Sequence, residues 1–149
     1  MPLAAFPKCY LDALCVEHSM TVEQWIDRAA NELDIDGLEF YWGFTPVNDP
    51  GQLALLRAKV ESLGLSIPMM CYSPDFTQPD ALARLEQIER QKLAIRTTAA
   101  LGGKYCRVLS GQRRPELTTT EGVRFAAECI TECLPAAAES DMVLILENH

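Results

Sequence analysis

The residue types and spacing at the end of the chain suit metal or acid–base chemistry. Glu147 and His149 follow the apolar run Val143–Leu146 and stand two positions apart. Because side chains alternate along a strand, Glu147 and His149 are predicted to share one face, with Asn148 on the other. A carboxylate beside an imidazole can bind a divalent cation or act as a general base with an orienting partner. The alternative is that Glu147 lies at the wet end of the strand and meets solvent or an arginine.

Other candidate residues follow earlier apolar runs, and each has two interpretations. Glu39 interrupts an apolar segment, so it is either turned inward and paired or turned outward and solvated. Trp42 can stack on a sugar ring or fill space at the end of its strand. His18 is either a ligand contact or a hydrogen-bonding residue of a loop. Arg113 and Arg114 can bind a phosphate or form surface ion pairs.

Four segments with helical spacing of apolar residues separate these candidates. They are predicted over residues 22–33, 50–63, 79–101 and 118–137, with apolar stripes that include Leu82 and Leu85 in the third and Val123 and Leu134 in the fourth. Capping boxes are predicted for Thr21 with Gln24 and for Thr118 with Glu121. Asp49 before Pro50 predicts an N-cap, and Gly64 predicts the end of the second helix.

The segments between the helices are short and apolar, as strands covered by helices usually are. Five strands are predicted: Cys9–Val16, Gly37–Gly43, Ser66–Tyr72, Tyr105–Leu109 and Val143–Glu147. Alternation of strands and helices predicts parallel strands with right-handed crossovers, in a single α/β domain over residues 1–149.

Two architectures accept this order of elements. A doubly wound open sheet of five strands fits the length, whereas a (β/α)8 barrel needs about 250 residues. The turn after the first predicted strand, Glu17-His18-Ser19-Met20, contains no glycine, which argues against a nucleotide-binding open sheet. The sequence stops directly after a strand, at His149. We therefore expect a (β/α)8 TIM barrel, of which about four and a half βα units are present.

Composition excludes several other classes of protein. The 149 residues carry a formal net charge of −8, which disfavours nucleic acid as a partner. No apolar run is long enough to cross a membrane, and the start lacks a basic leader, so we expect a cytoplasmic protein. Six cysteines without a CxxC pair are predicted to be core residues rather than disulfides or metal ligands. P-loop, HExxH, GxSxG and EF-hand motifs are absent.

Three segments carry a resemblance to a known family. The segments Asp12–Ser19, Gly37–Glu39 and Leu146–His149 resemble the xylose isomerase-like TIM barrels, the superfamily of sugar phosphate isomerases and epimerases that is related to the type-IV apurinic endonucleases. The resemblance covers the whole chain but only the amino-terminal half of such a barrel. The endonuclease branch takes zinc-binding histidines from the ends of strands two to four. The third and fourth predicted strands here end without histidine, which argues against that branch.

The resemblance implies a metal-dependent isomerase or epimerase that moves a proton through an enediolate. Glu147 corresponds to the glutamate that binds Mn²⁺, Mg²⁺ or Co²⁺ at the end of strand five, and it would also serve in acid–base catalysis. Glu39, Trp42, His18 and His149 are the expected contacts to a small sugar substrate. The family's remaining metal ligands lie on strands six to eight, which have no counterpart here. The 149-residue chain alone is therefore expected to hold metal poorly and to be an inactive fragment.

Two other functions remain open at this stage. One is a metal-dependent lyase or dehydratase acting on sugar-like hydroxyacids, which shares the enediolate chemistry. The other is a non-catalytic half-barrel that associates with a partner or a second copy through the open edge of its sheet.

Overall fold

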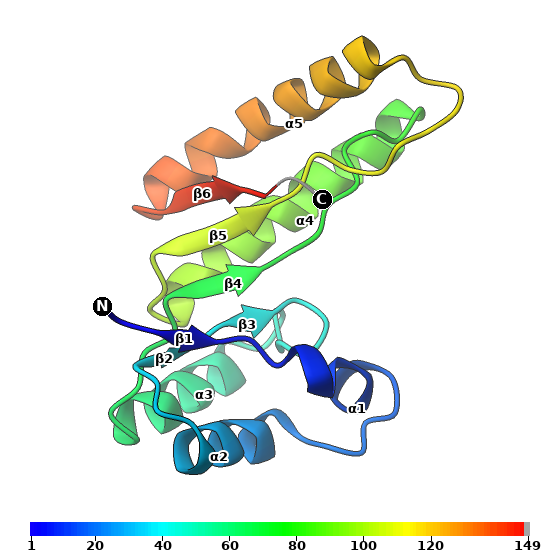
Figure 1. The fold of residues 1–149 in the computed structure, drawn as a ribbon. Coiled ribbons are helices and arrows are strands. Elements are labelled where there is room, and N and C mark those ends of the chain that lie inside the picture. The colour runs from blue at the N-terminus through cyan, green and yellow to red at the C-terminus, as the bar shows by residue number, and fades with distance from the viewer. Residues whose placement is uncertain (148–149) are drawn as a thin grey trace.

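The computed structural model describes residues 1–147 and shows alternating short strands and helices (Figure 1). Within this range the strands are β1 (Ala4–Ala5), β2 (Gly37–Leu38), β3 (Phe40–Tyr41), β4 (Met69–Cys71), β5 (Tyr105–Val108) and β6 (Val143–Leu146). A short 3₁₀ turn, η1 (Lys8–Tyr10), leads into the helices, which are α1 (Leu11–Cys15), α2 (Val22–Glu32), α3 (Pro50–Ser62), α4 (Ala81–Ala100) and α5 (Thr119–Glu139).

The strands are all parallel and follow one another in chain order. β1 pairs with β2, and β3, β4, β5 and β6 pair in sequence. A bridge between Gly37 and Ser66 connects the two sets, so they form one continuous arc. A doubly wound sheet reverses its strand order at a switch point, whereas this order never reverses. The prediction of a partial (β/α)8 barrel is therefore confirmed, and the open-sheet alternative is excluded.

The first predicted strand, Cys9–Val16, is wrong. These residues form η1 and α1, and the first strand is the earlier pair Ala4–Ala5. Leu11, Leu14 and Cys15 recur at helical spacing, and Leu14 is buried by this short helix. A two-residue strand shows no alternation, so the sequence pattern could not reveal β1.

The other four predicted strands are present with shorter bounds. The segment Gly37–Gly43 is divided at Glu39 into β2 and β3, and β4, β5 and β6 lie inside the remaining three segments. The strands point the same way, so their carboxyl ends lie together at one end of the sheet (Figure 1).

Helix starts follow the predicted capping residues. The side chain of Thr21 accepts from the Gln24 amide, and Thr118 accepts from the Glu121 amide, each in a reciprocal capping box. The Asp49 carboxylate caps α3. α3 ends before Gly64, whose φ of 75° is readily available only to glycine.

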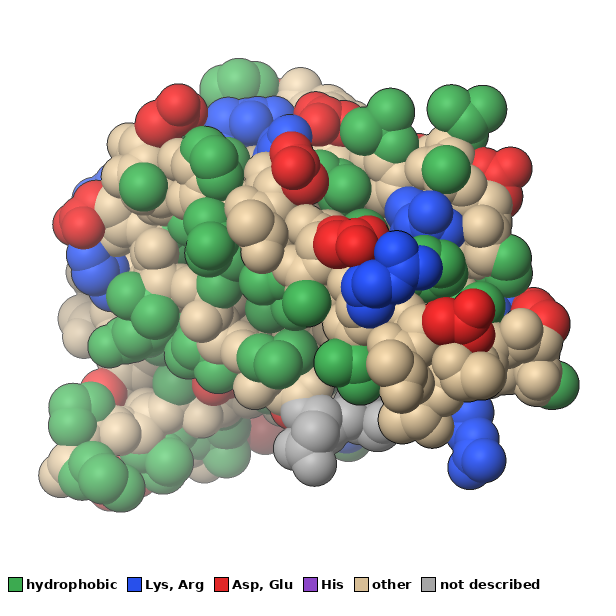
Figure 2. Space-filling view, turned by 90° about the horizontal axis from the view of Figure 1, so that it is seen from above, with side chains coloured by type: hydrophobic (Ala, Val, Ile, Leu, Met, Phe, Trp, Pro, Cys, Tyr) green, Lys and Arg blue, Asp and Glu red, His purple; other side chains and the backbone are tan. Residues whose placement is uncertain are grey.

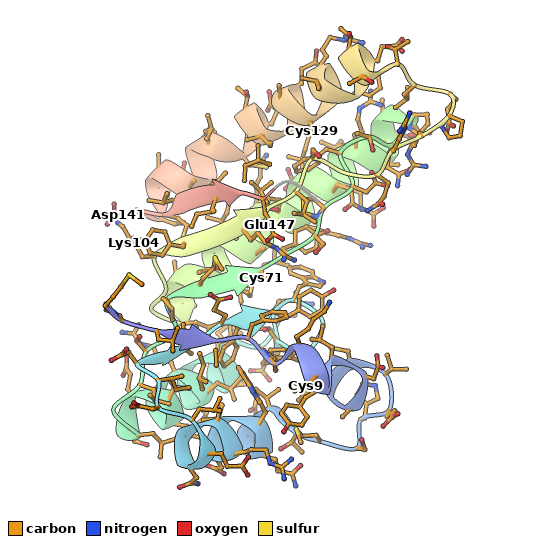
Figure 3. The ribbon with its side chains drawn as sticks, viewed as in Figure 1. Cys9, Cys71, Lys104, Cys129, Asp141 and Glu147 are labelled. Atoms are coloured by element: carbon orange, nitrogen blue, oxygen red, sulfur yellow. The ribbon has the colours of Figure 1, made fainter. Side chains whose placement is uncertain are left out.

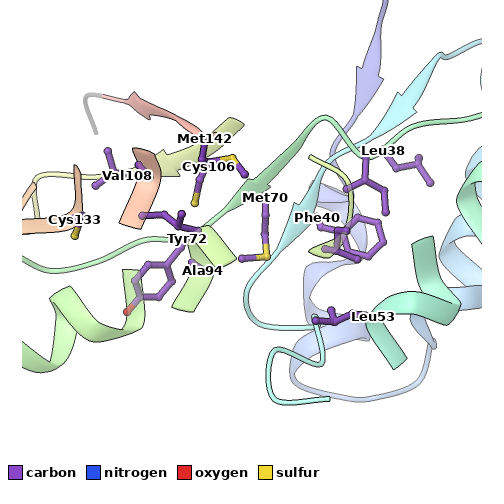
Figure 4. Packing of buried hydrophobic residues seen from close by; sticks show 14 of the residues in the cluster. Leu38, Phe40, Leu53, Met70, Tyr72, Ala94, Cys106, Val108, Cys133 and Met142 are labelled. Atoms are coloured by element: carbon purple, nitrogen blue, oxygen red, sulfur yellow. The ribbon is translucent and has the colours of Figure 1, made fainter. Parts of the chain in front are cut away.

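The core lies between the outer face of the sheet and the helices. Phe40, Met70 and Cys106 are paired in register on β3, β4 and β5 and are fully buried (Figure 4). Four of the six cysteines are buried apolar residues as predicted, whereas Cys9 is exposed and Cys15 is half-buried.

The predicted apolar stripes are wrong at the first turns of the two long helices. Leu82 and Leu85 of α4 and Val123 of α5 are exposed, as is Leu134 further along α5. α4 and α5 are 20 and 21 residues long, about 30 Å, whereas β5 is four residues long, about 13 Å. The first turns of these helices extend past the strand ends (Figure 1), so they have no sheet to pack against.

β6 forms one edge of the described sheet and is poorly covered. Val143, Ile145 and Leu146 are exposed, although all three are apolar. Figure 2 views the molecule from this side, and hydrophobic side chains are spread over the face between acidic and basic ones. No helix in residues 1–147 has the length and hydropathy needed to cross a membrane.

Candidate active site

One row of side chains crosses the sheet on the face opposite the helices. In the strand register Tyr41 lies beside Cys71, Cys71 beside Arg107, and Arg107 beside Ile145. The neighbouring row of Phe40, Met70 and Cys106 is buried against the helices, so alternation directs the first row to the inner face of the arc. Glu39 directly precedes β3 and Glu147 directly follows β6, two positions from Tyr41 and Ile145 respectively, so continued alternation places both on this inner face.

Arg107 joins the ends of three strands on the inner face. Its Nη1 lies 3.1 Å from Oε2 of Glu147, and its Nη2 donates to Oγ of Ser73 at 2.8 Å. Its Nε donates to the Tyr72 carbonyl at 3.4 Å. The Arg107 side chain is 15% exposed and that of Glu147 is 45% exposed, so the ion pair reaches from the interior to the rim. The sequence predicted that Glu147 either binds a ligand or meets solvent or an arginine. In the structure it is paired with an arginine.

Glu39 lies at the break between β2 and β3 and is half-buried. Burial raises the pKa of its carboxyl, the charge of Arg107 lowers it, and the charge of Glu147 raises it. Phe40, the next residue, is buried against the helices, so alternation places Glu39 on the inner face. Of the two predicted orientations, the inward one agrees with this placement.

Cys71 is the fourth member of this cluster (Figure 3). Burial raises the pKa of its thiol to about 12, while Arg107 opposes the shift and Glu39 and Glu147 add to it. The thiol is therefore protonated at neutral pH, and it is neither a nucleophile nor a ready metal ligand in this state.

The inner-face cluster does not by itself make a metal site. Among residues 1–147, no three histidine, cysteine or acidic side chains are placed to hold a metal ion. Mg²⁺ and Mn²⁺ require about six ligands, mostly oxygen, and here the positive charge beside Glu147 belongs to Arg107. The described residues thus do not fit the predicted Mn²⁺, Mg²⁺ or Co²⁺ on their own.

The remaining predicted contacts lie in different places. Trp42 follows β3 and packs on Tyr72, with ring centroids 4.7 Å apart and planes at 47°. His18 is exposed on the turn between α1 and α2, with a left-handed φ of 52°. His149 lies outside the described residues.

A second arginine–carboxylate pair lies beyond the ends of β4 and β5. Asp75 forms an ion pair with Arg114 and accepts hydrogen bonds from the amide and hydroxyl of Thr77, the side chain of Gln78 and the amide of Gln112. Burial alone would raise the pKa of Asp75, but these hydrogen bonds and the charge of Arg114 outweigh it and lower the pKa. The predicted ion-pair interpretation therefore holds for Arg114.

The loop between β5 and α5, which supplies Gln112 and Arg114, lines a cavity of about 520 Å³ at the start of α5. Gly111 has a φ of 122°, and a Cβ at this position would lie 2.7 Å from Oδ1 of Asp75. The close approach of the loop to Asp75 therefore requires glycine.

Arg107 is the functional residue that the sequence prediction missed. It stands alone as a cation in the otherwise uncharged strand Tyr105–Val108. A buried charge must find a partner, so its position one residue before the end of the strand was the available signal.

The parallel pairing of the strands in chain order defines this chain as half of a (β/α)8 barrel. A family model described as the xylose isomerase-like TIM barrel matches residues 28–149. The chain belongs to this family, as its motifs predicted. A comparison with curated proteins finds no match.

Solved structures similar to this chain include several sugar epimerases. The D-psicose 3-epimerase from Clostridium cellulolyticum H10, solved with D-tagatose, has a TM-score of 0.79 and 14% identity; the match covers 98% of this chain and 52% of the epimerase. A D-tagatose 3-epimerase-like protein has a TM-score of 0.77 and 16% identity, with coverage of 99% and 53%. The IOLI protein with a binding zinc atom has a TM-score of 0.76 and 17% identity, with coverage of 99% and 51%.

The structural similarities show the fold, and the family model shows that the chain is a xylose isomerase-like TIM barrel. The chain spans about half the length of the solved structures it matches. The half that it spans contains the inner-face cluster.

Proposed function

We propose that this chain forms the amino-terminal half of a divalent-metal-dependent isomerase or epimerase that acts on a sugar or sugar phosphate. The position of Glu147 carries the proposal. Its carboxylate is on the inner face at the carboxyl end of β6, where ligands meet the loops of a (β/α)8 barrel. The epimerases among the similar structures support a sugar as the substrate.

The proposed chemistry is the movement of one proton. A carboxylate removes the proton from the carbon beside the sugar carbonyl, an enediolate forms, and the proton returns to the same carbon or its neighbour. The raised pKa of Glu39 suits a group that gives and takes a proton. In this proposal Glu147 is a metal ligand and acid–base group, and Glu39, Trp42, His18 and His149 contact the sugar.

Metal binding in this proposal requires more than the described residues. The predicted ions are Mn²⁺, Mg²⁺ and Co²⁺, and in residues 1–147 Glu147 has no set of neighbouring ligands. The further ligands would come from additional strands, and the 149-residue chain by itself is expected to be inactive.

The test compares metal binding in a polypeptide that continues this sequence through a full barrel of about 250 residues or more. We expect calorimetry to show stoichiometric Mn²⁺ binding by this polypeptide and no binding by its Glu147→Gln variant. Glu139→Gln removes the same charge from the exposed end of α5 and is expected to leave binding intact. Equal affinity in the Glu147→Gln variant would remove Glu147 from the site.

A second candidate function is a half-barrel that associates with another copy of itself, and the exposure of β6 favours it. In the described sheet β6 pairs only with β5, so its other edge presents free backbone groups beside exposed Val143, Ile145 and Leu146. Sedimentation velocity of the wild-type chain is then expected to show a dimer that Ile145→Lys dissociates. Leu82→Lys, at an exposed leucine of α4, is the control. A monomeric wild type would contradict this function.

A further inference from the structure

The cavity at the start of α5 is lined by hydrogen-bond donors and by positive charge. Its volume of about 520 Å³ lies within the usual range of small-molecule sites. The lining contains two arginines and several hydroxyl and amide side chains, among them Arg113, Arg114, Thr77, Ser110, Gln112 and Thr118. None of the described residues that line it is acidic, although the whole chain has a net charge of −8. This lining favours an anionic ligand.

The two arginines differ in what they already bind. Arg114 donates to Oδ2 of Asp75, and its Nε is buried without an acceptor in residues 1–147. Arg113 is exposed, and within the same residues its side chain forms no ion pair or hydrogen bond. A guanidinium has five N–H donors, so both side chains keep donors that the described chain does not use. Because Asp75 balances the charge of Arg114, Arg113 gives the lining its net positive charge.

The loop that carries the arginines is held in place from the neighbouring loop between β4 and α4. The Gln112 amide donates to Oδ1 of Asp75 at 3.1 Å, and Oγ1 of Thr77 lies 2.6 Å from the Gln112 carbonyl oxygen. The residue directly before Arg113 is thus fixed through both its amide and its carbonyl. A loop that is already ordered loses less conformational entropy when a ligand binds.

We propose that this cavity is a binding site for a phosphate group, either as free phosphate or as part of a larger organic phosphate. Arginine binds phosphate through paired, charge-assisted hydrogen bonds. The terminal phosphate oxygens can accept from a guanidinium and from hydroxyl or amide donors at the same time. The dipole of α5 adds to the attraction, since the cavity lies at its amino-terminal end. The proposal requires neither Glu147 nor a metal ion.

The first test is a titration of the 149-residue chain with inorganic phosphate, followed by the backbone amide resonances of residues 110–119. These resonances are expected to shift in a saturable way. Arg113→Met is expected to bind phosphate about tenfold more weakly, because a charge-assisted hydrogen bond is lost. Arg96→Met removes an exposed arginine of α4 that does not line the cavity, so its affinity is expected to equal that of the wild type.

A second pair of variants tests the electrostatics of the cavity without changing an arginine. Val123 lines the cavity and is 64% exposed, so its replacement leaves the core intact. Val123→Glu places a negative charge in the lining and is expected to weaken phosphate binding about fivefold. Val123→Gln has nearly the same shape without the charge and is expected to bind phosphate as the wild type does.

Two further ligands distinguish the sources of the phosphate. D-Fructose 6-phosphate is expected to shift the same resonances, and D-fructose is expected to leave them unchanged. Tighter binding of the sugar phosphate than of inorganic phosphate would assign the cavity to an organic phosphate, and equal binding would assign it to free phosphate. The proposal is overturned if inorganic phosphate causes no saturable shift, or if Arg113→Met or Val123→Glu binds it as tightly as the wild type.

Discussion

Two arginine–carboxylate pairs lie at the carboxyl ends of the strands. They differ in how many hydrogen bonds the carboxylate accepts. The Asp75 carboxylate accepts from Arg114 and from three neighbouring residues, through four further hydrogen bonds. Among the described residues the Glu147 carboxylate accepts only from Arg107, and it is 45% exposed.

The difference separates a structural carboxylate from an available one. A carboxylate has about four positions for hydrogen-bond donors. Asp75 fills them with donors from its own loop between β4 and α4 and from the loop between β5 and α5. Glu147 has oxygen positions left over on the inner face, where a ligand can reach them. The predictions below test this contrast.

The largest expected effect is the loss of stability when Asp75 is replaced. Asp75→Asn is expected to lower the free energy of unfolding by about 2–4 kcal/mol, because the half-buried Arg114 and the Gln78 side chain both donate to Oδ2, which an NH2 group replaces. Glu147→Gln is expected to cost less than about 1 kcal/mol, as exposed ion pairs do. Urea unfolding of both variants measures the difference, and similar losses would remove the contrast between the two pairs.

The second-largest effect is expected on the pH dependence of stability, through the Asp75–Arg114 pair. The folded pKa of Asp75 is lowered from 3.8, so its contribution to stability is fully present above that value. The contribution is lost as the pH falls through 3.8 toward the lower folded pKa. Asp75→Asn should therefore flatten the dependence of unfolding free energy on pH in this acidic range. An unchanged slope would show that Asp75 does not supply it.

Glu39 is expected to change stability with pH in the opposite direction to Asp75. The folded pKa of Glu39 is raised above 4.5, so its charged form disfavours folding, and stability from this group increases as the pH falls through the folded pKa. Glu39→Gln should stabilise the chain at neutral pH by less than about 1 kcal/mol, since solvent screens a half-buried carboxyl. Thermal unfolding at neutral and mildly acidic pH measures it. A clear destabilisation would mean that pairing with Arg107 outweighs burial.

The last prediction concerns the reactivity of the Cys71 thiol, which lies near the two glutamates. Labelling of the native protein is expected to have the smallest effect on stability. At pH 8 exposed Cys9 should react quickly with a disulfide reagent, whereas Cys71, with a pKa of about 12, should react only when the chain unfolds. Mass spectrometry of labelled peptides identifies the sites. Rapid native labelling of Cys71 would show that water reaches the inner face more freely than its burial indicates.

Local chemistry was enough to predict helices α2, α3, α4 and α5, but not the short α1. Thr21, Asp49 and Thr118 cap their helices as the sequence indicated, because a cap depends on residues within one turn. Buried faces were harder to predict. Leu82 fits the helical stripe of α4 but is exposed, since its burial depends on a sheet that ends before it.

Part of the candidate site was also predictable from the sequence. Glu147 and Glu39 were selected because acidic residues inside apolar segments must be compensated. Their shared neighbour Arg107 was not selected, because the pairing joins residues 40 positions apart on different strands. Such a contact depends on the strand register, which no local pattern specifies.

The sequence by itself determined the alternation of strands and helices, the caps, and which side chains would be costly to bury. The tertiary structure decided that the strands follow in chain order, that Ala4–Ala5 rather than Cys9–Val16 forms the first of them, and that Arg107 pairs with Glu147. The physical reason is range. Helix periodicity and capping act within a few residues, whereas strand pairing and charge compensation join segments whose proximity exists only after the chain has folded.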